Sequence, residues 1–233
     1  MAHSQRWHEH RVQLRIGSML ILLLLLVLNV FVVPFTIAPD SGFARVSRDV
    51  LLTLILLSGV ATVWGHRAQF VAIALVASVA IAVRWMEWLV PRGTTAGLLD
   101  GTALFSLGIL CVLIGIRVFS GGTVTFDRIL GAIALYVLVG VVWAESYQLV
   151  SLRVPGAFAG IPHDLDPRDH SIWVYFSFVT LTTVGYGDIT PVAHAAKSLA
   201  ILEALIGQLY PAIVLARLVS LHVASEGSGA DRA

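Results

Sequence analysis

The chain contains little charge for its length. Of its 233 residues, 58% are hydrophobic and only 12% are charged, whereas a soluble domain has about 25% charged residues. The net charge of +1 offers no basic surface for nucleic acid. The single cysteine, Cys111, lies in an apolar run, so no disulfide can form within the chain. These absences leave an integral membrane protein as the predicted class.

Long apolar runs predict six membrane-spanning helices, because a helix needs about 20 apolar residues to cross a bilayer. We expect them at about 16–38, 49–64, 68–90, 97–118, 126–150 and 194–223. The first run follows Arg6, Arg11 and Arg15, as the core of a secretory signal peptide would. It is longer than the roughly 7–15 residues of such a core, so we interpret it as a retained helix.

An apolar segment too short to cross a membrane lies between the fifth and sixth runs. Residues 151–169 are polar, and residues 170–182 form an apolar stretch of half the needed length. A half-length helix is tolerated at membrane depth only where protein surrounds it. It leads into a motif that occurs once in the chain. The motif reads Thr182, Thr183, Val184, Gly185, Tyr186, Gly187 and Asp188.

These residue types suit a cation that exchanges its water shell for oxygen atoms. Consecutive backbone carbonyls can face one axis only if alternate residues adopt unusual backbone angles, which Gly185 and Gly187 tolerate. Thr183 adds a hydroxyl at the inner end. Four such loops are needed to surround an ion, so we expect a homotetramer with cyclic symmetry.

The motif and its surroundings resemble the potassium channel superfamily over about residues 126–223. The resemblance implies a re-entrant pore helix and a selectivity filter formed by residues 183–187. It implies that K⁺, as the permeant ion and with no other cofactor, is coordinated at four filter residues. These are Thr183, Val184, Gly185 and Tyr186.

Two aromatic residues of the half-length helix differ from the usual family pattern. Most relatives have Trp at both positions, where this chain has Tyr175 and Phe176. The resemblance implies that such rings brace the filter, together with the flanking Thr182 and Asp188. Tyr175 keeps a hydroxyl that could reach Asp188, whereas Phe176 has no donor for the filter tyrosine. A cation channel of relaxed selectivity is therefore an alternative.

The sixth run contains three residues that the resemblance places below the filter. Gly207 falls at the position of the family's inner-helix hinge, although a role in packing alone is an alternative. Pro211 removes a helix hydrogen bond and can bend the helix. By the same alignment, Gln208 and Pro211 face a water-filled cavity.

Two acidic residues fall within the expected membrane region, where a carboxylate is costly and indicates function by default. Glu145 lies near the outer end of its helix, where a side chain that snorkels to the interface or pairs structurally is the alternative. Glu203 lies about 140° around its helix from Gln208, taking about 100° per residue, so it points away from the ion path. We hypothesise that it anchors the half-length helix and replaces an acid that many relatives have at the position of Val179; a partly hydrated acid with no such role is the alternative. The donors within reach are Ser177, Tyr147 and Tyr175.

The first four runs match the voltage-gated plan in number only. Residues 97–120 contain one basic residue, Arg117, whereas steep gating uses about 3–4 charges per subunit. We therefore expect weak voltage dependence. The linker at about 118–126 is too short to carry these runs to a neighbouring subunit.

The sequence thus predicts an all-α membrane protein, a passive K⁺ channel and not an enzyme. A poorly conducting sensor or partner subunit is a further alternative. We expect a bacterial cell membrane, both termini in the cytoplasm, only membrane lipids and copies of the chain as partners, and no soluble regulatory domain. The expected parts are a tail at 1–15, a four-helix domain at 16–120, a pore domain at 121–223 and a disordered tail at 224–233.

Overall fold

A computed structural model describes residues 19–36, 42–62, 67–86, 96–120, 126–161 and 169–230. Over these residues the protein is mostly helical. An α-helical stretch from Met19 leads into the first labelled element. The helices are η1, a π-helical turn (Leu28–Val32), α2 (Val33–Thr36), α3 (Gly42–Thr62), α4 (Arg67–Met86), α5 (Ala96–Phe119), α6 (Phe126–Arg153), α7 (His170–Leu181) and α8 (His194–Ala230), and the strands are β1 (Phe158–Ala159) and β2 (Thr190–Pro191).

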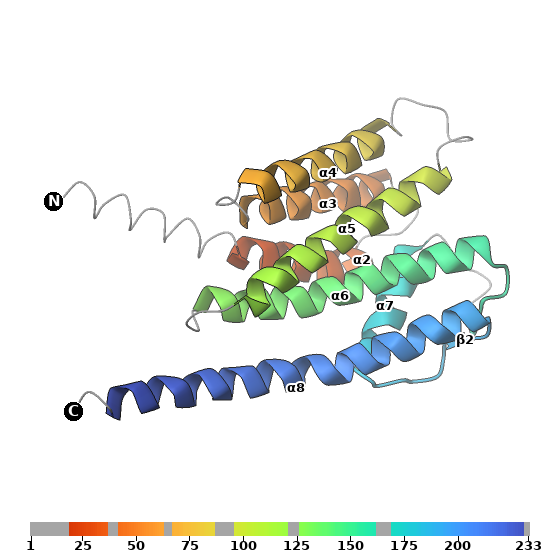
Figure 1. Cartoon of the computed structure of the whole chain (residues 1–233). Helices are drawn as coiled ribbons and strands as arrows, with labels where there is room; N and C mark the ends of the chain where they lie inside the picture. Colours follow the sequence, from red (N-terminus) through yellow and green to blue (C-terminus); the bar gives the residue numbers. More distant parts are fainter. Residues whose placement is uncertain are drawn as a thin grey trace.

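Helix α6 lies at the centre of the arrangement. Figure 1 shows α3, α4 and α5 on one side of α6 and the long α8 on the other, with the short α7 between α6 and α8. Helix α6 contacts α5, α7 and α8, and α5 also contacts α3 and α4. Helix α6 therefore separates α3–α5 from α8, and both α7 and α8 pack against it.

Three helical stretches in the described part of the chain are long and apolar enough to cross a membrane. They are Gly101–Phe119, Phe126–Arg153 and His194–Arg217. Helix α7, with 12 residues, is too short, as expected. Six spans therefore remain a sequence prediction. Shorter apolar helical stretches in the described residues are Met19–Val32 and Ala74–Val83.

The π-helical turn in the first run has a sequence cause. The N–H of Val33 donates to the carbonyl of Leu28, five residues back. The next residue, Pro34, has no N–H, so the α-helical ladder is interrupted at that point in any case. The ring of Phe31 in this turn lies 5.9 Å from the ring of Phe178 in α7. The first run thus contacts the half-length helix of its own chain.

Helices α6 and α8 are joined by polar groups of aromatic side chains. The Tyr210 hydroxyl donates to the carbonyl of Ala132 over 2.7 Å, and the Trp143 indole N–H donates to the carbonyl of Leu199 over 3.1 Å. A polar group in an apolar surrounding costs free energy unless it is hydrogen-bonded. These contacts therefore help to fix how α8 lies along α6.

Two expected boundaries are corrected by the structure. Helix α3 begins at Gly42 rather than near residue 49, and α8 continues to Ala230. The stretch 224–230, expected to be a disordered tail, is therefore helical. Extending an existing helix needs no new nucleus, so even a segment with Gly227 and Gly229 can continue α8. The tails at 1–15 and 231–233 lie outside the described residues.

Candidate functional site

The site is built on the half-length helix α7. Asp169 precedes the helix, and its carboxylate accepts a hydrogen bond from the N–H of Ser171 over 2.9 Å, as an N-cap residue does. At the other end, Thr182 caps the helix: its N–H and its hydroxyl both donate to the carbonyl of Phe178. The chain then leaves the helix as the ribbon 182–188.

Alternate residues of this ribbon have positive φ angles. The values are +61° at Thr183, +57° at Gly185 and +79° at Gly187. Glycine adopts such angles freely. For the β-branched Thr183 the angle is unusual, and such strain persists only where the surrounding structure imposes it, typically at a functional site.

Two N–H groups of the ribbon turn back to the helix that precedes it. The N–H of Val184 and the N–H of Gly185 both donate to the carbonyl oxygen of Val179, over 3.0 Å and 3.2 Å. Where neighbouring residues alternate in hand, their N–H groups gather on one side. We therefore expect the carbonyl groups of this ribbon to face the opposite side, away from α7.

The ribbon is not covered by the part of the chain that the structure describes. Residues 182–188 are all exposed, and the side chain of Tyr186 is 72% exposed. The apolar face of α8 beside the ribbon is exposed as well, with Ile201 at 71% and Leu205 at 55%. Backbone outside a helix is found at membrane depth only where protein or a water-filled cavity borders it.

The two aromatic residues singled out in the sequence have different roles. The Tyr175 hydroxyl donates to Oδ2 of Asp188 over 2.6 Å, which confirms the expected contact. This hydrogen bond is the main cause that lowers the pKa of Asp188 below its ordinary value. Phe176 is buried, with its ring 4.8 Å from that of Tyr147 and 5.5 Å from that of Phe158. Phe176 thus packs α7 against α6 and β1 through aromatic contacts.

Glu203 of α8 is fully buried and faces α7 and α6. Its Oε1 lies 2.5 Å from the Ser177 hydroxyl of α7, and its Oε2 lies 2.5 Å from the Tyr147 hydroxyl of α6. Two of the three donors named from the sequence are thus its partners, and Tyr175, bonded to Asp188, is not. One carboxyl group therefore links three helices behind the ribbon.

The Ser177 hydroxyl also lies 2.7 Å from the carbonyl of Gly140. A hydroxyl carries one proton, and a carbonyl can only accept. If Ser177 donates to Gly140, its oxygen is free to accept, and a neutral Glu203 that donates to Ser177 and accepts from Tyr147 satisfies every group in the chain of contacts. The geometry thus suits the acid form of Glu203.

The three residues expected below the filter lie on one continuous helix. A methyl group built on Gly207 would overlap the backbone carbonyl of Leu181, so glycine is required where α8 crosses the end of α7. That packing role is a finding; a hinge at Gly207 stays a prediction. Gln208 is exposed and its amide donates to the Thr183 hydroxyl over 3.3 Å, and Pro211 is exposed within the helix.

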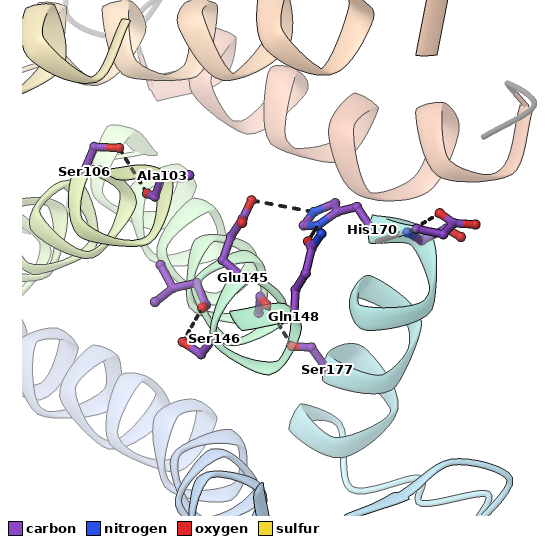
Figure 2. A network of polar contacts seen from close by, with 11 residues as sticks. Ala103, Ser106, Glu145, Ser146, Gln148, His170 and Ser177 are labelled. Carbon is purple, nitrogen blue, oxygen red and sulfur yellow. Dashed lines mark hydrogen bonds and ion pairs between the residues drawn. The ribbon is translucent and has the colours of Figure 1, made fainter. Parts of the chain in front are cut away.

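A second polar cluster lies at the start of α7 (Figure 2). His170 Nδ1 lies 3.0 Å from the amide oxygen of Gln148, and its Nε2 lies 3.9 Å from the carboxylate of Glu145. Both partners belong to α6. The structural pairing considered for Glu145 is therefore present, and it joins the first residue of α7 to the central helix.

Three features of the site were not predicted from the sequence. The motif predicts positive φ for the glycines of the ribbon but not for Thr183. The sequence indicates Ser177 as a donor but not its contact with Gly140. It also does not indicate Gly160, which touches the backbone of Asp188. The first has a signal, since alternation from Gly187 and Gly185 reaches residue 183; the other two depend on tertiary packing.

Comparisons with known proteins give one family match and two relatives. Residues 149–223 match a protein family described as "Ion channel". The chain is 28% identical over 116 residues to Protein LctB of Bacillus caldotenax, covering 48% of this chain and 86% of that protein. It is 48% identical over 46 residues to Protein LctB of Geobacillus stearothermophilus, covering 20% of this chain and 34% of that protein. The chain thus carries an ion channel domain over residues 149–223.

Replacing Tyr175 with Phe should make the site more sensitive to acid. Because the Tyr175 hydroxyl holds the pKa of Asp188 below its ordinary value, the charged carboxylate of the wild type survives to a lower pH than that of an unpaired Asp, whose pKa is about 3.9. Without the hydroxyl, protonation should begin at a higher pH.

The measurement is ion conduction as the pH at the filter side falls from about 6 to about 3, a range that brackets the ordinary pKa of Asp. The midpoint of the loss should lie at higher pH in Tyr175→Phe. In the background Asp188→Asn the Tyr175 substitution should have no such effect. Equal midpoints for the wild type and Tyr175→Phe would contradict this role of the hydroxyl.

Replacing Glu203 with Gln should have little effect, whereas replacing it with Leu should destabilise the protein. Gln can donate to Ser177 and accept from Tyr147, as the acid form does, so stability and conduction should stay close to those of the wild type. Leu leaves the buried Tyr147 hydroxyl without this acceptor, which costs about 1–3 kcal/mol. Thermal unfolding in detergent and open-state lifetimes measure both effects. A Leu variant as stable and as long-lived in conduction as the wild type would show that the carboxyl group does not anchor α7.

Proposed function

We propose that the protein is a K⁺-selective ion channel formed by four copies of the chain. The observation that carries the proposal is the ribbon 182–188, whose alternate residues have positive φ and whose N–H groups turn to the Val179 carbonyl. Carbonyl groups that face a common axis replace the hydration shell of K⁺, which is how such a loop acts as a selectivity filter. The ion channel family match at 149–223 supports the same conclusion.

Within this proposal each residue of the motif has a defined part. K⁺ is coordinated at Thr183, Val184, Gly185 and Tyr186, and Gly187 completes the outer end. Thr182 and Asp188 hold the ends of the ribbon, through their contacts with Phe178 and Tyr175.

Below the filter, Gln208 and Pro211 border the water-filled cavity. The hydrogen bond from Gln208 to the Thr183 hydroxyl supports this assignment, because it joins α8 to the inner end of the ribbon. A polar side chain on an otherwise apolar helix is favourable where it meets water.

The homotetramer follows from what one chain leaves uncovered. The ribbon is exposed, and the apolar side chains of α8 beside it are exposed. A single ribbon offers carbonyls from one side only, whereas a permeating ion needs a ring of them. Cyclic symmetry supplies that ring by repeating the same surface four times.

We infer six spans in a cell membrane, with the filter near the outer face and both termini in the cytoplasm. This arrangement requires that the first run, α3 and α4 cross the bilayer together with α5, α6 and α8. The packing of the first run against α7 through Phe31 and Phe178 supports a place for it beside the pore unit of its own chain.

A channel of relaxed selectivity is the second candidate. Phe176 lies in apolar packing and has no group that could donate to Tyr186, so one side of the filter is braced without a hydrogen bond. The balance between the two candidates depends on how rigidly Tyr175, Glu203 and the helix end hold the ribbon. A poorly conducting partner subunit is the remaining outcome.

Purified protein in liposomes should conduct K⁺ at least about tenfold faster than Na⁺, a ratio that corresponds to about 1.4 kcal/mol. Ba²⁺, which is close in size to dehydrated K⁺, should block the flux. Gly185→Ala and Gly187→Ala should abolish selectivity or conduction, because alanine opposes the positive φ at both positions.

A matched control is Gly101→Ala, since a methyl group there meets nothing within 4 Å and the residue lies in helix α5. This variant should conduct like the wild type. Equal K⁺ and Na⁺ permeability of the wild type would favour the second candidate, and absence of flux would favour the partner subunit.

The conductance should change little with membrane voltage. Residues 97–120 contain only Arg117 as a basic residue, and Arg117 lies in the last turn of α5, 3.7 Å from the carboxylate of Asp127. One paired charge at a helix end moves little through the field, whereas one charge crossing it completely is worth about 2.3 kcal/mol per 100 mV. Bilayer recordings in symmetrical K⁺ test this, and a conductance–voltage curve as steep as that of a channel with four charged sensors would refute it.

A further inference from the structure

The outer end of the ribbon touches a second structural element in addition to α7. After α6 the chain forms β1, which pairs antiparallel with β2, the strand that follows the ribbon. Phe158 lies opposite Pro191, and Ala159 lies opposite Thr190. The carbonyl of Ala157 also accepts hydrogen bonds from the N–H groups of residues 192 and 193, over 2.8 Å and 3.1 Å. The segment leaving the ribbon is thus bound to the segment leaving α6.

Strand β1 is anchored in the core behind α7. Phe158 is buried, and its ring lies 4.8 Å from that of Trp173, 5.5 Å from that of Phe176 and 5.8 Å from that of Tyr147. These residues belong to α7 and α6. Since aromatic contacts of this kind fix both position and orientation, β1 cannot move freely relative to the helix that supports the filter.

Gly160 follows β1 and contacts the ribbon directly. Its φ angle is +89°, and a methyl group built on it would overlap the backbone carbonyl of Asp188 and lie 3.3 Å from Cα of Ile189. The two backbones can approach this closely only because residue 160 has no side chain. Asp188 is therefore held twice: its side chain by Tyr175 and its backbone by Gly160.

We propose that the β1–β2 pair and Gly160 form a positioning element that fixes the backbone of Asp188 and so keeps the outer end of the filter in its conducting conformation. The part of this proposal that is tested by ion conduction rests on the proposed function. The structural part concerns the order of residues 184–193 and does not depend on whether the protein conducts. Gly160 is a positioning residue, since it acts on the ion path through Asp188.

Two glycines of the same loop provide a matched comparison. Gly156 has a φ of +73°, close to that of Gly160, but a methyl group built there meets nothing within 4 Å. Gly156→Ala and Gly160→Ala therefore impose similar backbone strain, and only the second creates a collision with Asp188. Any difference between them reports the contact and not the backbone angle.

Amide hydrogen exchange of the full-length protein in detergent gives the structural readout. In Gly160→Ala, peptides covering residues 184–193 should exchange at least about tenfold faster than in the wild type, a factor that corresponds to about 1.4 kcal/mol. Gly156→Ala should match the wild type in these peptides. Equal exchange in the two variants would overturn the proposal.

Liposome recordings give the functional readout. The K⁺ current of Gly160→Ala should decline during sustained recording, and higher K⁺ at the filter side should slow the decline, because an ion that binds the native filter stabilises it by mass action. Stable current from Gly160→Ala would overturn the proposal. If the exchange difference is found but the wild type itself passes no K⁺, the proposed function fails and the positioning role stands.

A second variant applies if Gly160→Ala does not fold. Opposite residues of an antiparallel pair have Cα atoms about 4.5–5.5 Å apart, within the range that a disulfide spans. Ala159→Cys with Thr190→Cys, in a Cys111→Ala background and oxidised with diamide, should slow exchange in 184–193 and preserve conduction. If this disulfide leaves hydrogen exchange unchanged or abolishes an existing K⁺ current, the proposed role of the β1–β2 pair is wrong.

Discussion

The pair of hydrogen bonds on the Val179 carbonyl is the interaction on which the rest of the site depends. It binds the N–H groups of Val184 and Gly185 to the end of α7, so these N–H groups face the helix. It also opposes a local cost, because Thr183 has a positive φ that a β-branched residue disfavours. A strained conformation of this kind persists only when its surroundings leave no alternative. The position and rigidity of α7 are therefore the first requirement of the proposed filter.

The surroundings supply that rigidity through contacts on every side of α7. Its start is joined to α6 by His170 with Glu145 and Gln148. Its middle is joined to α8 and α6 by Glu203, a fully buried carboxyl group between two hydroxyls. Its end is crossed by α8 at Gly207, where only a glycine fits. Polar groups buried among apolar helices favour one arrangement strongly, because each alternative arrangement leaves some of them without partners.

Many contacts of the candidate site could be predicted from the sequence, and those that could not have an identifiable physical reason. The bounds of α7, the bond from Tyr175 to Asp188 and two of the partners of Glu203 follow from local spacing, helix geometry and family resemblance. The family resemblance singled out Gly207 but not its contact with Leu181, and nothing in the local sequence singled out Gly160. Both contacts join segments separated by more than twenty residues. The extension of α8 beyond residue 223 fails differently, since composition indicated disorder where continuation of an existing helix prevailed.

The two sides of the ribbon 182–188 differ in how much of the chain contacts them. One side of the ribbon is bound by α7, Tyr175, Gln208 and Gly160, and the other side is exposed, as is the neighbouring apolar face of α8. Backbone outside a helix is found at membrane depth only where protein or a water-filled cavity borders it. A structure that holds one side of a ribbon so firmly and leaves the other open is suited to a partner that supplies both apolar cover and oxygen-binding charge. Under the proposed function, further copies of the same chain would provide the cover, and a cation on the shared axis would provide the charge.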